Sequence, residues 1–144
     1  MFFGECALRI DDKNRVVIPT RFRPEFLHGL VLAQGMDPTP CINVFPLAEW
    51  DRFCQRINAV PLDKSRGRDL RRLFFSTAFP TEMDRQGRVV LPPALRQYAQ
   101  LAGEAVVIGA GDHLEIWGRE AWAQAKKRLE ELRWHLTETL EQRS

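Results

Sequence analysis

Short apolar stretches alternate with charged turns in a pattern that occurs twice along the chain. In the first half, residues 7–10 and 16–18 flank a polar turn, and in the second half residues 77–83 and 89–91 do the same. Two short apolar stretches separated by a polar turn are typical of a β-hairpin. We therefore expect one hairpin with charged residues at its tip in each half.

The same series of further elements follows each hairpin. Pro19 and Pro92 precede short stretches of helical pattern, where proline is tolerated because the first turn of a helix does not need its N–H. Residues 30–33 and 105–108 are apolar stretches short enough to be buried strands, and each is followed by a turn and another strand. A helix closes each half, so the pattern predicts an α+β fold.

The two closing helices differ in length. Residues 47–57 have the pattern of an ordinary amphipathic helix. From Arg119 onward, apolar residues recur at steps of three and four, which predicts one continuous helix of about 24 residues and roughly 36 Å. Its stripe consists of Trp122, Ala125, Leu129, Leu132, Leu136 and Leu140. Packing on its own domain and contact with another subunit are both open explanations of this stripe.

A basic segment joins the halves. It contains Lys64, Arg66, Arg68, Arg71 and Arg72 and has no low-complexity character, so we expect a helical connector. These side chains are interpreted either as phosphate contacts or as a solvated face or subunit contact. The resulting division is a first module at 1–60, the connector at 61–76 and a second module at 77–144.

Both halves carry the motif D-x-x-x-R-V-V-[IL]-P, which begins at Asp11 and again at Asp84. Another arginine, Arg23 or Arg96, lies four residues after each motif proline. The repeated order of elements indicates an internal duplication. An acidic residue four positions before an arginine suits an ion pair across a tight turn, although exposed pairs contribute only about 0–1 kcal/mol. We interpret Asp11 and Asp84 as residues that shape the turns.

The turn tips carry side chains that suit the major groove of DNA. Arginine can form two hydrogen bonds with guanine, whereas lysine and backbone amides hold phosphates. The candidate contact residues are Lys13, Asn14, Arg15, Arg85 and Arg88. Residues 7–23 contain five basic and two acidic residues, compared with three and two in residues 80–96, so the first turn is expected to bind better. Basic turns are common on protein surfaces, so these residues alone leave DNA binding as one of several options.

Composition narrows the class of protein. A net charge of +2 is only weakly basic, so any DNA-binding face must come from local clustering. Three cysteines without CxxC spacing argue against disulfides and zinc, and we expect neither a metal nor another cofactor. No stretch approaches the roughly 18 apolar residues of a membrane helix, and charged residues appear too early for a secretory signal. We expect a cytoplasmic protein without a membrane partner.

An enzyme is the first alternative, because paired Asp and Arg residues occur in hydrolase sites. His28, His113 and His135 are far apart in the sequence, and no nucleophile lies beside a base. The sequence also lacks phosphate-loop, dinucleotide and serine-hydrolase motifs. We expect no catalytic residues and no small-molecule substrate.

Four segments resemble the MraZ family of bacterial proteins, which is related to the AbrB transition-state regulators. They are MFFGECALRIDDKNRVVIPTRFR, PLAEW, EMDRQGRVVLPPALRQYAQL and LEIWGREAW, and the resemblance extends from residue 1 to about residue 132. It implies two tandem AbrB-like modules with swapped hairpins, which form one pseudo-twofold β-barrel with flanking helices. One departure is Asn14, which replaces the glycine that the family usually has before the motif arginine. Asparagine tolerates the left-handed backbone, so we expect the turn to survive.

The resemblance also implies a function. The chain would form a homo-oligomeric ring on repeated promoter boxes in double-stranded DNA, associated with the nucleoid, and repress the division and cell-wall gene cluster. A second interpretation stays open: a ring-forming scaffold that binds another protein, in which the motifs serve only the fold. Its support is the long C-terminal stripe and Trp134.

Overall fold

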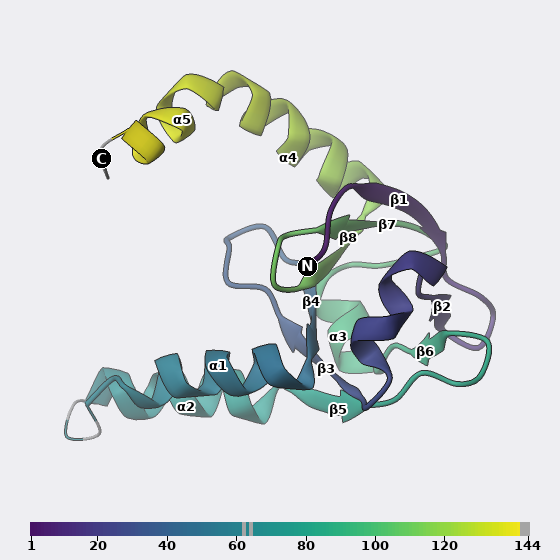
Figure 1. Ribbon diagram of the computed structural model, residues 1–144, viewed down its shortest axis with the longest axis horizontal. Coiled ribbons are helices and arrows are strands. Elements are labelled where there is room, and N and C mark those ends of the chain that lie inside the picture. The colour runs from purple at the N-terminus through teal and green to yellow at the C-terminus, as the bar shows by residue number, and fades with distance from the viewer. Residues whose placement is uncertain (62, 64, 142–144) are drawn as a thin grey trace.

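A six-stranded antiparallel sheet, with the strand order β1-β7-β8-β4-β3-β5, forms the centre of the molecule (Figure 1). The computed structural model describes residues 1–61, 63 and 65–141. The strands are β1 (Glu5–Arg9), β2 (Arg15–Val17), β3 (Leu30–Gln34), β4 (Ile42–Pro46), β5 (Phe79–Thr81), β6 (Arg88–Val90), β7 (Glu104–Gly109) and β8 (Leu114–Gly118). The helices are η1 (Thr20–Phe26), α1 (Leu47–Asn58), α2 (Ser65–Ser76), α3 (Pro93–Tyr98), α4 (Arg119–Glu131) and α5 (Arg133–Glu141). The predicted α+β class is confirmed.

Strands of the two modules interleave. β1 pairs with β7, β5 pairs with β3, and β2 forms a separate two-stranded ladder with β6. When each strand is exchanged with its counterpart in the other module, the strand order reads the same in reverse. The two strands that flank each charged turn therefore pair with the other module and not with each other, in contrast to the local hairpins expected from the pattern.

The closed barrel expected from the family resemblance is wrong, because the sheet is open in the described part of the chain. β1 and β5 are its edges, and β2 and β6 do not bridge them but form their own ladder. The β5 edge has only three residues and includes Pro80, which has no N–H to offer to a further strand. These features end the sheet at β5.

Two helical segments also differ from the expectation. The first proline-led helix is a 3₁₀ helix, η1, and contains Pro24, which cannot donate the hydrogen bond of a regular α-helix. The expected continuous C-terminal helix is broken at Leu132, which separates α4 from α5. After Ala125 no described residue of either helix is buried, so no packing surface keeps the two segments coaxial.

One core is shared by both modules. It includes Val16 and Ile18 from the first module and Val89 and Leu91 from the second, all of which are fully buried. A smaller cluster lies beneath α1 and α2, where Leu70 and Phe74 pack against Phe45, Phe53 and Ile57. Because the main core takes strands from both halves, the position of each motif depends on the whole molecule.

Two helical arms leave the sheet, α1 with α2 and α4 with α5, and both point away from the end that carries β2 and β6 (Figure 1). The connector thus contains the helix α2, although its Lys64 lies outside the described residues. Among the described residues, the C-terminal stripe packs on its own domain through Trp122 and Ala125. No helix in the described ranges is long and apolar enough to cross a membrane.

Candidate nucleic-acid interface

The Asp11 carboxylate closes the first turn. Its Oδ1 accepts hydrogen bonds from the backbone N–H groups of Lys13 (2.9 Å) and Arg15 (2.8 Å), and its Oδ2 accepts one from Arg15 Nε (2.7 Å). The Asp11 N–H donates to the Arg15 carbonyl at 3.0 Å. The backbone N–H of Arg15 is the main cause that holds the pKa of Asp11 below its ordinary value, with the Arg15 side chain adding to it. The carboxylate is therefore ionised, and both of its oxygens accept hydrogen bonds within the turn.

The second turn has the same construction. Asp84 Oδ1 accepts from the backbone N–H groups of Gln86 and Arg88, both at 2.9 Å, and Oδ2 accepts from Arg88 Nε at 2.6 Å. The residue before each arginine has a left-handed backbone, with φ of 60° at Asn14 and 76° at Gly87. Glycine adopts this conformation without strain, and asparagine tolerates it better than most residues. The replacement of glycine by Asn14 thus leaves the turn geometry intact.

The two turns lie side by side at one end of the molecule (Figure 1). In the β2–β6 ladder, Arg15 is opposite Val90 and Arg88 is opposite Val17. Two backbone hydrogen bonds extend the ladder into the turns, from Ile18 N–H to the Gly87 carbonyl (2.8 Å) and from Leu91 N–H to the Asn14 carbonyl (2.9 Å). The fold therefore joins two motifs that are far apart in the sequence.

Both motif arginines keep part of their hydrogen-bonding capacity. The Arg15 and Arg88 side chains are 24% and 33% exposed, and only Nε of each takes part in the ion pair with its aspartate. Within the described residues, their terminal Nη atoms have no hydrogen-bond partner. Lys13 and Arg85 are exposed on the same two turns, and Asn14 is half-buried. The structure thus brings the predicted contact residues Lys13, Asn14, Arg15, Arg85 and Arg88 to one end of the molecule.

Arg23 lies at the second turn, although the sequence places it in the first module. Its Nε donates to the Ile18 carbonyl at 2.8 Å. A Cβ added at Gly87 would lie 2.3 Å from this Nε and 2.5 Å from Cζ, so the guanidinium rests directly on the glycine. By its position in the sequence, Arg23 belongs with the first turn. The interleaving of the modules moves this charge to the second turn and weakens the expected difference between them.

In the sequence, Arg23 stands out because an arginine lies four positions after each motif proline. The equivalent residue in the second module, Arg96, has a different environment: its Nε is buried without a hydrogen-bond partner among the described residues. Spacing identified both arginines but gave no information on the turn that each would contact, because the contact depends on how the modules cross.

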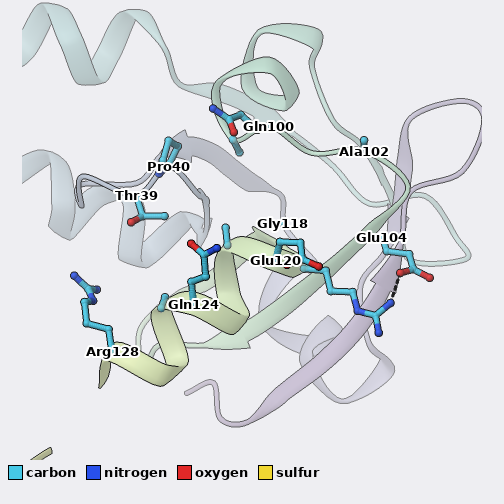
Figure 2. Close-up of a pocket in the computed structure, with 13 residues that line it drawn as sticks. Thr39, Pro40, Gln100, Ala102, Glu104, Gly118, Glu120, Gln124 and Arg128 are labelled. Atoms are coloured by element: carbon cyan, nitrogen blue, oxygen red, sulfur yellow. Dashed lines mark hydrogen bonds and ion pairs between the residues drawn. The ribbon is translucent and has the colours of Figure 1, made fainter. Parts of the chain in front are cut away.

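A cavity of about 680 Å³ lies away from the turns, between the β3–β4 loop, the segment after α3 and the start of α4 (Figure 2). Its lining carries both charges. Glu104 forms an ion pair with Arg119, and Glu120 and Arg128 also line the cavity. Such a mixed lining does not match the run of negative phosphates along DNA, which favours a basic surface. Across the described residues, no group of three or more His, Cys, Asp and Glu side chains is placed to hold a metal ion.

Comparison with known proteins identifies the family. The model described as "MraZ protein, putative antitoxin-like" matches residues 1–73 and again residues 74–144. A protein of Dehalococcoides mccartyi named transcriptional regulator MraZ is 39% identical over 142 residues, which cover 99% of each chain. Proteins of the same name from Herpetosiphon aurantiacus and Paenarthrobacter aurescens are 43% and 44% identical over 122 residues, 85% of this chain and 84% of theirs. The chain therefore belongs to the MraZ family, as do these proteins named transcriptional regulators.

Proposed function

We propose that this chain is a sequence-specific DNA-binding repressor of the division and cell-wall gene cluster. In this proposal it acts in the cytoplasm, on the nucleoid, as a ring-shaped homo-oligomer on repeated promoter boxes. The observation that carries the proposal is the pair of motif turns at one end of the molecule, each with an arginine whose Nη atoms have no partner in the described part of the chain. The names of the relatives add support for a role in transcription.

The aspartates prepare these arginines for binding. Arginine has five N–H donors, and the ion pair with Asp11 or Asp84 uses only the one on Nε. The side chain is thereby held in one orientation before DNA arrives, which reduces the conformational entropy lost on binding. The Nη donors of Arg15 and Arg88 are then the groups proposed to read guanine O6 and N7 in the major groove.

Lys13 and Arg85 are proposed to hold phosphates on either side of the bases that are read. Both are exposed near the turn tips, where a cation contributes affinity without reading sequence. Asn14 is half-buried beside Arg15 and would add a contact at the first turn only. Because the whole chain has a net charge of only +2, one subunit is expected to bind weakly. A ring that engages several promoter boxes would raise the affinity by about 10²–10⁴ through effective concentration.

A binding experiment with DNA from upstream of the chain's own gene tests the proposal. We expect wild type to form a specific complex that weakens as salt rises, because neutralised phosphates release counterions. Arg15→Ala and Arg88→Ala should each weaken specific binding roughly 5- to 150-fold, the range for loss of a two-bond contact with a base. Arg52→Ala removes an exposed charge from α1, far from the turns, and serves as the matched control.

The same measurement separates this proposal from the protein-binding scaffold. If wild type forms no specific complex at low salt, the DNA-binding proposal fails. If wild type binds but Arg15→Ala and Arg88→Ala bind equally well and stay folded, the motif arginines are not the readers. Loss of folding in Arg15→Ala would instead favour a purely structural motif, which is the basis of the scaffold interpretation.

A further inference from the structure

The ribbon face, defined here as the outer side of the β2–β6 ladder, consists of Arg15, Val17, Arg88 and Val90. Each valine is directly opposite an arginine of the other module, and residues opposite each other in an antiparallel pair point to the same side. The middle pair of the ladder points to the other side and is buried in the core. Val17 is 45% exposed and Val90 is 55% exposed. Each module thus places one exposed valine beside the motif arginine of the other module.

The small apolar area of the ribbon face argues against a protein partner. Two valines offer far less than the roughly 1,000 Å² that a specific protein interface buries. A second copy placed on the ribbon face would set arginine against arginine, and like charges oppose association. The guanidinium groups of Arg15 and Arg88 have Nη donors without a partner among the described residues. A matching partner therefore offers hydrogen-bond acceptors and small apolar groups side by side.

The major groove of DNA presents this combination of groups. It is about 12 Å wide and admits a two-stranded β-ribbon. Guanine presents two hydrogen-bond acceptors there, and the C5 methyl of thymine is an apolar group on the same floor of the groove. Residues two positions apart on one strand, such as Arg15 and Val17, are separated by about 7 Å. That distance is close to two base-pair steps of about 3.4 Å each, so the ribbon face fits guanine and thymine within two base pairs of each other.

We propose that Val17 and Val90 determine part of the DNA specificity by contacting the C5 methyl groups of thymines. This inference rests on the proposed function and deepens it, because it adds a second base to the guanine bound by each motif arginine. Since each valine is opposite the arginine of the other module, the thymine contacted by Val17 lies beside the guanine bound by Arg88. The ribbon face then lies in the groove with the two turns at its ends.

Removal of the thymine methyl groups from the DNA tests the contact directly. Two duplexes with the sequence upstream of the chain's own gene are compared, one with thymine and one with deoxyuridine in place of every thymine. Uracil lacks only the C5 methyl, so the phosphates and the base pairing are unchanged. We expect wild type to bind the uracil duplex at least roughly fourfold more weakly, since one buried methyl group contributes about 0.8 kcal/mol. Fluorescence anisotropy measures both dissociation constants.

Valine variants assign the difference between the duplexes to the ribbon face. Val17→Ala with Val90→Ala should bind the thymine duplex more weakly than wild type does and should lose the difference between the two duplexes, and each single variant should lose part of it. Met36→Ala removes a 56% exposed apolar side chain from the β3–β4 loop, away from the ladder, and should keep the full difference. The ratio of the two dissociation constants should not change with salt, because both duplexes carry the same phosphates.

Equal binding of wild type to the two duplexes would overturn the thymine contact and leave the proposed function standing. The contact is also overturned if the valine variants are folded, as checked by far-ultraviolet circular dichroism, and keep the full wild-type difference. The single variants answer the question if the double variant does not fold. A wild type that forms no specific complex with the thymine duplex contradicts the proposed function itself, so the two failures are distinguishable.

Discussion

At the level of single residues, each motif is a turn closed by hydrogen bonds among five consecutive residues. An aspartate accepts three hydrogen bonds from residues two and four positions later, and the residue before the arginine has a positive φ. Gly87 has a further requirement, because the Arg23 guanidinium occupies the place where a side chain would begin. The two turns therefore share their hydrogen bonds but differ in their tolerance of substitution.

Gly87→Ala is expected to destabilise the protein by more than the roughly 1–2 kcal/mol of a left-handed alanine, because the new Cβ also displaces Arg23. Asn14→Gly should change the free energy of unfolding by less than about 0.5 kcal/mol, since glycine accepts the same φ. Urea unfolding measures both. The double variant Gly87→Ala with Arg23→Ala should recover part of the loss. Additive losses in the double variant would contradict the contact.

At the scale of elements, the strands are held at their ends by polar side chains as well as by the ladder. The turn between β7 and β8 is an example. His113 Nδ1 lies 2.6 Å from Asp112 Oδ1, and Nε2 lies 3.0 Å from Glu115 Oε2 on β8. The imidazole also stacks on Phe45 of β4 at 5.2 Å between centroids. One titratable ring thus connects a turn with two central strands.

The stability of this turn should depend on pH. Desolvation alone lowers the pKa of His113, but hydrogen bonds with Glu115 and Asp112 outweigh it, so the pKa is raised above its ordinary value. A raised folded-state pKa means that the stabilisation is complete below the unfolded value of about 6.5 and is lost as pH rises through the folded value. Urea unfolding of wild type and His113→Gln should therefore show a larger difference near pH 6 than near pH 8.5. A difference that is equal at both pH values would contradict this assignment.

At the scale of the whole molecule, two modules of similar sequence form one folded unit. Val16 of β2 and Val89 of β6 are paired across the two-stranded ladder and are both fully buried in the shared core. The turns that they follow are consequently held together by packing between modules. The helical arms extend away from the end of the molecule that carries the turns (Figure 1).

Coupling between the modules can be measured at this pair. Val16→Ala and Val89→Ala should each reduce the free energy of unfolding by about 1.5–3 kcal/mol, the value of a buried valine side chain. Because the two residues are in register, the double variant should differ from the sum by at least about 0.5 kcal/mol. Simple additivity, or two separate unfolding transitions for the two halves, would show that the modules are not coupled in this way.

The sequence alone determined the features that depend on neighbouring residues. The duplicated motif, the aspartate that accepts from an arginine four positions later, and the positive-φ position before that arginine are local, so Asp11, Asn14 and Arg15 could be interpreted together. The α+β class followed from the spacing of the apolar residues and the length of the apolar stretches. The residues alone indicated only a basic turn. DNA binding became the main functional interpretation through the family resemblance.

Which module each strand pairs with depends on the tertiary structure. The two motifs have nearly the same sequence. The hydrophobic pattern therefore cannot distinguish pairing of β2 within its own module from pairing with β6. The sequence likewise did not reveal the contact of Arg23 with Gly87, the open edges of the sheet or the exposure of the stripe beyond Leu129. Each of these depends on which segments, far apart in the chain, pack against one another, and the packing of the whole fold determines that.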